Sequence, residues 1–146
     1  MAHLLAPAAL QALDDDIQLN VRQLYLLGRA HFTFAKRLAP RNWRQTVSRS
    51  YYAAYNVSKS IRLHVSGTYS SETTDHSRIG DLPGSFPTKS TYANQLAVLR
   101  RDRNLSDYDH TVGEADLVLG RTATVELVES FLRDARLFLR GLGVPI

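Results

Sequence analysis

Apolar residues recur at steps of three and four along four segments of the chain, the spacing typical of one face of an α-helix. The first segment covers about Asp14–Leu38, starts with three acidic residues and is followed by Pro40, which favours a helix stop. The second covers about Asn42–Ser66, with asparagine as N-cap and Gly67 as a stop signal. The predicted inward positions are Ile17, Val21, Leu24, Leu27, His31, Phe34 and Leu38 in the first helix, and Trp43, Val47, Ala54, Val57, Ile61 and Val65 in the second.

Two further helices are predicted in the C-terminal half of the chain. The third begins near Ser90 and the last ends near Leu142. Thr111 and Glu114 have the spacing of a capping box, which predicts a break after His110 and a new helix start. The last helix has an apolar face broad enough to pack on two neighbouring helices or on a second protomer. That face comprises Val125, Leu127, Val128, Phe131, Leu132, Ala135, Phe138, Leu139 and Leu142.

The connection between the second and third helices, about residues 67–90, is rich in serine, threonine, glycine and proline. A connection of this length in a small domain predicts either a functional loop or a partly disordered segment. It contains His76, which we expect to be a solvated loop histidine rather than part of a site. The stretch Met1–Leu13 contains Pro7 and lacks a basic leader, so it predicts a packing arm or a short first helix.

The remaining patterns exclude several fold classes. The chain shows no alternating strand pattern, no internal repeat and no apolar run of the roughly 18 residues that a membrane span requires. Its 146 residues correspond to one domain. The sequence therefore predicts an all-α fold, a single-domain antiparallel bundle of four to five helices over residues 1–146, with one long polar loop and no contact with a membrane.

The amino-acid composition excludes several kinds of catalytic and metal site. The absence of cysteine excludes disulfides, thiol catalysis and thiolate metal sites, and it suits a cytoplasmic location. Arginine supplies 15 of the 18 basic residues, because Lys36, Lys59 and Lys89 are the only lysines. Guanidinium groups bind phosphate bidentately and stack on bases, so this bias is compatible with nucleic-acid contact. A genome rich in G and C, which favours arginine codons, explains the bias equally well.

The inward stripe of the third helix continues into polar residues. Tyr92, Leu96 and Leu99 lie at steps of four and three, and a further step of four leads to Arg103. His110 follows seven residues later, within about 20° of the same stripe if the helix continues. A cation and a titratable imidazole are therefore expected to point inward or across an interface, where they are costly unless they have partners or a role.

This pair suits one kind of chemistry. The chain has no glycine-rich phosphate loop, no strong zinc spacing and no serine-centred nucleophile motif. A histidine transfers protons near neutral pH, and an arginine stabilises the charge on a pentacoordinate phosphate, so together they suit RNA cleavage without a metal. The alternative is structural, with His110 as a helix cap and Arg103 in an ion pair. The candidate ion-pair partners are Asp102, Asp107 and Asp109.

Two helices and the segment between them resemble the HEPN family, small helical-bundle proteins of prokaryotic toxin–antitoxin and defence systems. Ser50–Tyr55 is similar to the Tyr-Tyr-Ala segment of small stand-alone members, and Arg103–Tyr108 resembles their Arg-x-x-(Ala/Ser)-Asp-Tyr block. The connection with Asp75–Ser77 and Phe86 is similar to their variable connection. The likeness covers about Trp43–Leu142.

The family's ribonuclease signature is an arginine, usually followed by a polar residue, with a histidine after four to six further residues; Arg103, Asn104 and His110 match it with six. The resemblance implies an endoribonuclease with RNA as substrate and no metal or cofactor. The resemblance also implies a homodimer whose Arg–His motifs face a shared cleft. In this role Arg103 stabilises the transition state, His110 is the general acid or base, and Asn104 orients the phosphate, with Asp107 and Tyr108 in support.

The resemblance also implies a protein partner, a minimal nucleotidyltransferase that acts as antitoxin. In some such pairs the partner modifies a tyrosine two residues after the histidine, and that position is Val112 here. The sequence leaves one alternative function open. The chain is then a non-catalytic helical module that binds a nucleotidyltransferase or a nucleotide.

Overall fold

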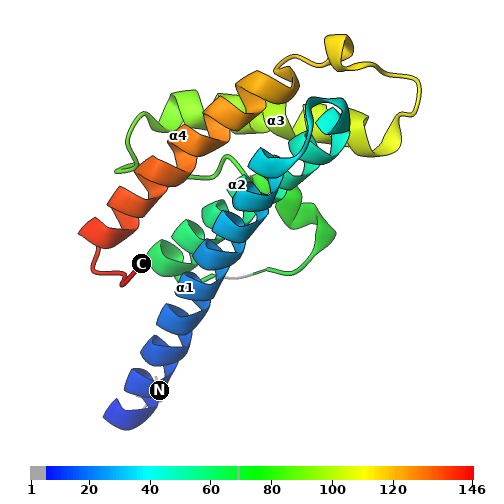
Figure 1. Ribbon diagram of the computed structural model, residues 1–146. Coiled ribbons are helices and arrows are strands. Elements are labelled where there is room, and N and C mark those ends of the chain that lie inside the picture. Colours follow the sequence, from blue (N-terminus) through cyan, green and yellow to red (C-terminus); the bar gives the residue numbers. More distant parts are fainter. Residues whose placement is uncertain (1–5, 69) are drawn as a thin grey trace.

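The computed structural model describes residues 6–68 and 70–146, which form a bundle of α-helices (Figure 1). No strand occurs within these residues, so the prediction of an all-α bundle is confirmed. The long helices are α1 (Pro7–Arg37), α2 (Trp43–Ser66), α3 (Lys89–Tyr108) and α4 (Gly120–Gly141). The short 3-10 helices between them are η1 (Pro40–Asn42), η2 (Thr73–Arg78) and η3 (Glu114–Asp116).

The central helix is α2, which packs against α1, α3 and α4, whereas those three contact one another much less. In Figure 1, α1 and α2 run side by side as a long pair, and the first turns of α1 extend beyond the rest of the bundle. The pair is very close at Gly28, where an added Cβ would lie 2.7 Å from the carbonyl oxygen of Ala53. Gly28 of α1 and Ala53 of α2 permit this close approach because both residues are small.

The first helix, α1, differs from its predicted form in its start and in its buried face. It begins at Pro7, so residues 7–13 belong to the helix. Proline is favourable in the first turn because the amide hydrogen that it lacks would have no helical partner there. Residues 1–5 of the predicted arm lie outside the described part of the chain. Leu27 and Phe34 are about half exposed, contrary to prediction, because the face toward α2 is centred on Gly28. The buried residues of α1 are Val21, Tyr25, Gly28, Phe32 and Ala35.

The second helix, α2, has its predicted bounds. It follows Asn42 and ends before Gly67, whose φ of 66° is a conformation that glycine adopts without strain. Most residues from Thr46 to Leu63 are buried, because the other three helices surround α2. Val65 in the last turn is half exposed, contrary to the predicted stripe. The predicted positions that are fully buried are Val47, Ala54, Val57 and Ile61.

The connection from α3 to α4 is longer than predicted. The third helix ends at Tyr108, and the predicted capping box of Thr111 and Glu114 starts no α-helix. Thr111 instead donates hydrogen bonds from its amide and its hydroxyl to Asp109, at 2.9 and 2.6 Å. Glu114 Oε1 accepts a hydrogen bond from the amide of Arg121, at 2.8 Å, in the first turn of α4.

A buried aspartate of α3 caps the N-terminal end of α4. The fully buried Asp102 accepts hydrogen bonds from the amides of Val118, at 3.0 Å, and Leu119, at 2.7 Å. Amides at a helix start have no helical partner and carry partial positive charge, so a carboxylate there is stabilising. Asp102 thereby fixes α4 against α3, and it forms no ion pair with Arg103.

The segment from α2 to α3 contributes to the core. It contains η2, and Ile79, Leu82 and Phe86 are buried in the common hydrophobic cluster. The predicted polar loop is thus packed on the bundle only in part, because these three apolar side chains are buried whereas residues 67–68 and 71–74 are exposed. Residue 69 lies outside the described residues.

Much of the broad apolar face of α4 is buried within the chain, although Val125 and Phe138 are only partly buried. Leu127 and Phe131, which widen that face, are buried in the cluster shared with the other helices, and Leu142 beyond the helix end is about half exposed. Packing on neighbouring helices is therefore the alternative that the structure bears out for these two residues. None of the helices among the described residues combines the length and apolar character that crossing a membrane requires.

Candidate functional site

The third helix buries an arginine where the sequence predicted one. Arg103 follows Tyr92, Leu96 and Leu99 on the buried stripe of α3, and only 6% of its surface is exposed. Its guanidinium carbon lies 4.5 Å from the ring centre of Tyr51. The corresponding distances are 5.2 Å for Tyr52 and 5.9 Å for Tyr108. These aromatic faces stabilise a cation that has lost most of its water.

The polar contacts of Arg103 leave part of its bonding capacity unused. Nη1 donates to Asn104 Oδ1 at 2.8 Å, and Nη2 donates to the Tyr52 hydroxyl at 3.2 Å. Nε lies 3.6 Å from Asp107 Oδ2 but forms no hydrogen bond within the described residues. A guanidinium has five N–H donors, so donors remain for an additional acceptor such as a phosphate oxygen.

Of the three aspartates considered as ion-pair partners, only Asp107 pairs with Arg103 in the described structure. Asp102 caps α4, and Asp109 accepts hydrogen bonds from Thr111. These hydrogen bonds lower the pKa of Asp109. Asp107 also accepts a hydrogen bond from the Ser48 hydroxyl at 3.3 Å, which links α3 to α2.

His110 does not share the buried stripe of Arg103, contrary to the geometric prediction. The helix ends two residues before it, so the helical rotation that would have turned His110 inward is interrupted, and its side chain is exposed. The turn that carries it is held by Arg44 of α2, which donates to the carbonyl oxygens of Asp109, at 2.9 Å, and Val112, at 2.5 Å. His110 is therefore a solvent-accessible group on a fixed turn.

An unexpected histidine lies against the same tyrosines as Arg103. His76 of η2 is only partly exposed, contrary to the prediction of a solvated loop residue. Its ring stacks on Tyr55 with a centre-to-centre distance of 4.2 Å, and Nδ1 lies 2.7 Å from the Tyr51 hydroxyl. Burial and the nearby Arg103 lower the pKa of His76.

A buried ion pair fixes the position of His76. The preceding residue, Asp75, accepts two hydrogen bonds from Arg62 of α2, at 2.8 and 3.0 Å, and a third from the Tyr55 hydroxyl at 2.8 Å. Because Arg62 donates to the charged carboxylate, the pKa of Asp75 is lowered. Tyr55 thus anchors Asp75 with its hydroxyl and supports His76 with its ring.

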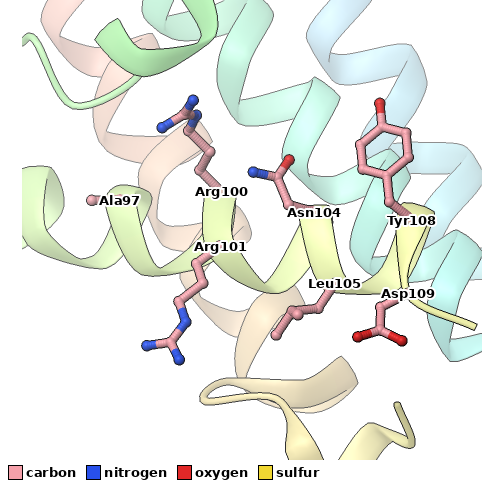
Figure 2. Close-up of a pocket in the computed structure, with 7 residues that line it drawn as sticks. All are labelled: Ala97, Arg100, Arg101, Asn104, Leu105, Tyr108 and Asp109. Carbon is pink, nitrogen blue, oxygen red and sulfur yellow. The ribbon is translucent and has the colours of Figure 1, made fainter. Parts of the chain in front are cut away.

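An open cavity of about 590 Å³ lies on the outer face of α3, and one of its lining residues is Asn104, which accepts a hydrogen bond from Arg103. Figure 2 shows that Arg100, Asn104 and Tyr108 extend from one side of the helix, and Arg101 and Leu105 from the other. Tyr108 is 75% exposed, so its ring is available for stacking. The volume falls within the range of about 300–1,000 Å³ that is typical of ligand sites. The lining residues are Ala97, Arg100, Arg101, Asn104, Leu105, Tyr108 and Asp109.

The structure thus gathers Arg103, Asn104, Asp107 and Tyr108 around the end of α3, with His110 on the following turn. Sequence reasoning missed His76. The available signal was the stripe of Tyr51, Tyr55 and Arg62, whose polar groups inside a central helix require partners from another segment. Within the described residues, no cluster of three or more histidine or acidic side chains is suited to a metal ion.

Comparison of the chain with protein-family models, with curated proteins and with solved structures found no match.

Proposed function

We propose that the chain is a metal-independent endoribonuclease of the HEPN type that acts as a homodimer. The observation that carries this proposal is the position of Arg103. Its guanidinium is almost completely buried among tyrosines and retains unused donors. Asn104, to which it donates a hydrogen bond, lines an open cavity together with Arg100 and Arg101. A desolvated cation beside an accessible, positively charged surface is an arrangement suited to a phosphodiester.

The proposed reaction uses the ribose as internal nucleophile. The 2′-oxygen loses its proton to a base and attacks phosphorus, and the bond from phosphorus to the 5′-oxygen breaks as that oxygen gains a proton. The products are a 2′,3′-cyclic phosphate and a free 5′-hydroxyl. His110 transfers one of these protons, because an imidazole can both accept and donate a proton. Arg103 stabilises the additional negative charge of the pentacoordinate phosphate.

The cavity supports binding of single-stranded RNA. The exposed ring of Tyr108 offers a face on which a base can stack, and Arg100 and Arg101 offer charge to the flanking phosphates. Asn104 holds Arg103 through its side-chain oxygen, which leaves its amide nitrogen directed to other acceptors. A twofold dimer would place His110 of one protomer beside Arg103 of the other, so that two symmetry-related composite sites face a shared cleft.

A second candidate function is favoured by the contacts that Arg103 already has. Its hydrogen bonds to Asn104 and Tyr52 and its ion pair with Asp107 are those of a structural arginine. On this hypothesis the chain is a non-catalytic module, and the cavity of α3 binds a nucleotide or a nucleotidyltransferase partner. Binding of a nucleotide without any RNA cleavage distinguishes this function from the first.

The direct test is cleavage of single-stranded RNA by the purified chain in EDTA. We expect cleavage by the wild type and a loss of about 100-fold or more in His110→Ala, the usual contribution of a general acid or base. Arg103→Lys keeps the charge but not the planar fork, and we expect a similar loss. His64→Ala and Arg22→Ala are matched controls at the far end of α2 and on the exposed face of α1. Equal background cleavage by wild type and His110→Ala contradicts the proposal.

A further inference from the structure

The tautomer of His76 follows from its contact with Tyr51. Burial raises the pKa of Tyr51 to about 12, so its hydroxyl keeps its proton at neutral pH. Tyr51 is fully buried, and within the described residues His76 Nδ1 is the one hydrogen-bond partner of its hydroxyl. An unpaired buried O–H is costly, so the hydroxyl donates to Nδ1. The neutral imidazole then carries its own proton on Nε2.

His76 is fixed in this orientation on several sides. Tyr55 stacks on one face of the ring, and the ring centre of Tyr52 lies 6.1 Å from that of His76 in a T-shaped arrangement. The Asp75–Arg62 pair anchors the preceding residue. A donor with so little freedom loses little entropy when it binds an acceptor.

The surroundings of His76 are positively charged. Arg100 and Arg103 of α3 and Lys59 of α2 each disfavour its protonated form, while the neighbouring Asp75 favours it. The negative charge of Asp75 is already shared with Arg62 and the Tyr55 hydroxyl. The cations therefore outnumber the anion around the imidazole, which is the electrostatic condition for binding an anion.

We propose that His76 is a phosphate-binding residue, whose Nε2–H contacts an RNA backbone phosphate together with Arg103 and Arg100. This inference rests on the proposed ribonuclease function and adds to it a residue from a different segment of the chain. Arg103 and His76 lie against the same two tyrosines, and Arg100 joins them to the cavity of α3. A phosphodiester in this position extends the binding surface from α3 to η2.

Phosphate binding at this position has a consequence for pH dependence. A bound phosphate offsets the positive charge of Arg100, Arg103 and Lys59, so it raises the pKa of His76 toward and beyond its ordinary value. By linkage, RNA then binds more tightly as the pH falls and His76 takes up a proton. Tyr51 and Tyr55, which also face the ring, remain neutral over this range because burial raises the pKa of both hydroxyls.

The test is NMR titration of the histidine rings in the full chain, free and with a 2′-O-methyl RNA hexamer that cannot be cleaved. We expect a pKa of His76 below 6.5 in the free protein, and a rise on RNA binding that His64 does not show. We also expect RNA affinity to increase about threefold or more from about pH 7.5 to about pH 5.5. His76→Asn, which keeps an acceptor for Tyr51, should lose this increase. His76→Gln, which keeps a donor near Nε2, should retain most of the affinity at neutral pH.

Two outcomes overturn the inference. One is RNA binding that leaves the His76 titration unchanged. The other is a response to inorganic phosphate alone with none to RNA, which would assign the contact to free phosphate. If the protein cleaves RNA but the titration of His76 is unchanged by RNA binding, the His76 contact is refuted and the proposed ribonuclease function is not. A responsive His76 in a chain that cleaves no RNA refutes the nuclease instead.

Discussion

At the scale of single residues, the site depends on buried polar groups that satisfy one another. Asp75 is 2% exposed, and Arg62 is 8% exposed. Two charges this deeply buried are stable only because their geometry is bidentate and because Tyr55 donates a further hydrogen bond. The same pair determines where His76 lies, so the stability of the fold and the shape of the site are coupled at Asp75.

Replacing Asp75 by asparagine leaves Arg62 as an uncompensated buried charge. We expect Asp75→Asn to lower the free energy of unfolding by about 3 kcal/mol at neutral pH, measured by urea denaturation. The control is Asp81→Asn, which breaks the exposed ion pair with Arg78 and should change the free energy of unfolding by less than about 0.5 kcal/mol. A loss for Asp75→Asn no larger than that control would contradict the role of this pair.

The pH dependence of this contribution has a defined sign. The folded-state pKa of Asp75 is lowered, so the unfolded chain binds its proton first as the solution is acidified. The stabilisation is therefore present above about pH 4, the ordinary value for the unfolded chain, and is lost as the pH falls through the folded pKa. The difference between wild type and Asp75→Asn should shrink in that acidic range.

At the scale of elements, the junction between α3 and α4 positions the site. Asp102 joins the buried face of α3 to the first amides of α4, and Arg44 of α2 holds the turn between them. The turn contains His110, so its position depends on three helices rather than on the continuation of one. This explains why helical periodicity predicted Arg103 correctly but not His110.

Asp102→Ala removes the cap and leaves buried amides without acceptors. We expect the free energy of unfolding to fall by about 2 kcal/mol, which combines the loss of an N-cap with unsatisfied buried donors. The measurement is thermal or urea denaturation, with Asp14→Ala on the exposed part of α1 as the matched control. Equal stability of the two variants would show that Asp102 is dispensable for docking α4.

The bounds of a helix could be predicted from the sequence where a local signal, such as a glycine stop, ends the helix. Asn42 and Gly67 bound α2 as expected, and at Gly67 the reason is local, because its positive φ ends the helix; the Asn42 side chain forms no capping hydrogen bond within the described residues. The start of α1 was missed because Asp14–Asp16 is also an acceptable N-cap region, and the earlier start at Pro7 extends the helix. The buried face of α1 differs from the predicted one because it is determined by the contact of Gly28 with α2. The periodicity of α1 alone carries no information about that contact.

At the scale of the whole molecule, the segments that form the site are distant in sequence. Tyr51 and His76 are 25 residues apart, and Tyr52 and Arg103 are 51 apart. The inward direction of Arg103 was encoded in one helix and was predicted. The burial of His76 depends on its packing against α2 and on the buried Asp75, so no pattern within its own segment indicated it.

The proposed nuclease also requires two copies of the chain. If each active cleft combines Arg103 of one protomer with His110 of the other, Arg103→Lys and His110→Ala remove the activity of their own homodimers. A mixed dimer of the two variants retains one cleft in which both groups are native. The activity of a mixture therefore reports directly whether the site is composite.

The decisive measurement is RNA cleavage in EDTA by an equimolar mixture of Arg103→Lys and His110→Ala, after dissociation and reassociation. Random pairing gives half mixed dimers with one native cleft each, so we predict recovery of about a quarter of wild-type activity. Each variant alone, treated identically, should stay near background. A mixture that remains at the background of the separate variants, while wild type cleaves, would contradict a composite Arg103–His110 site shared between two protomers.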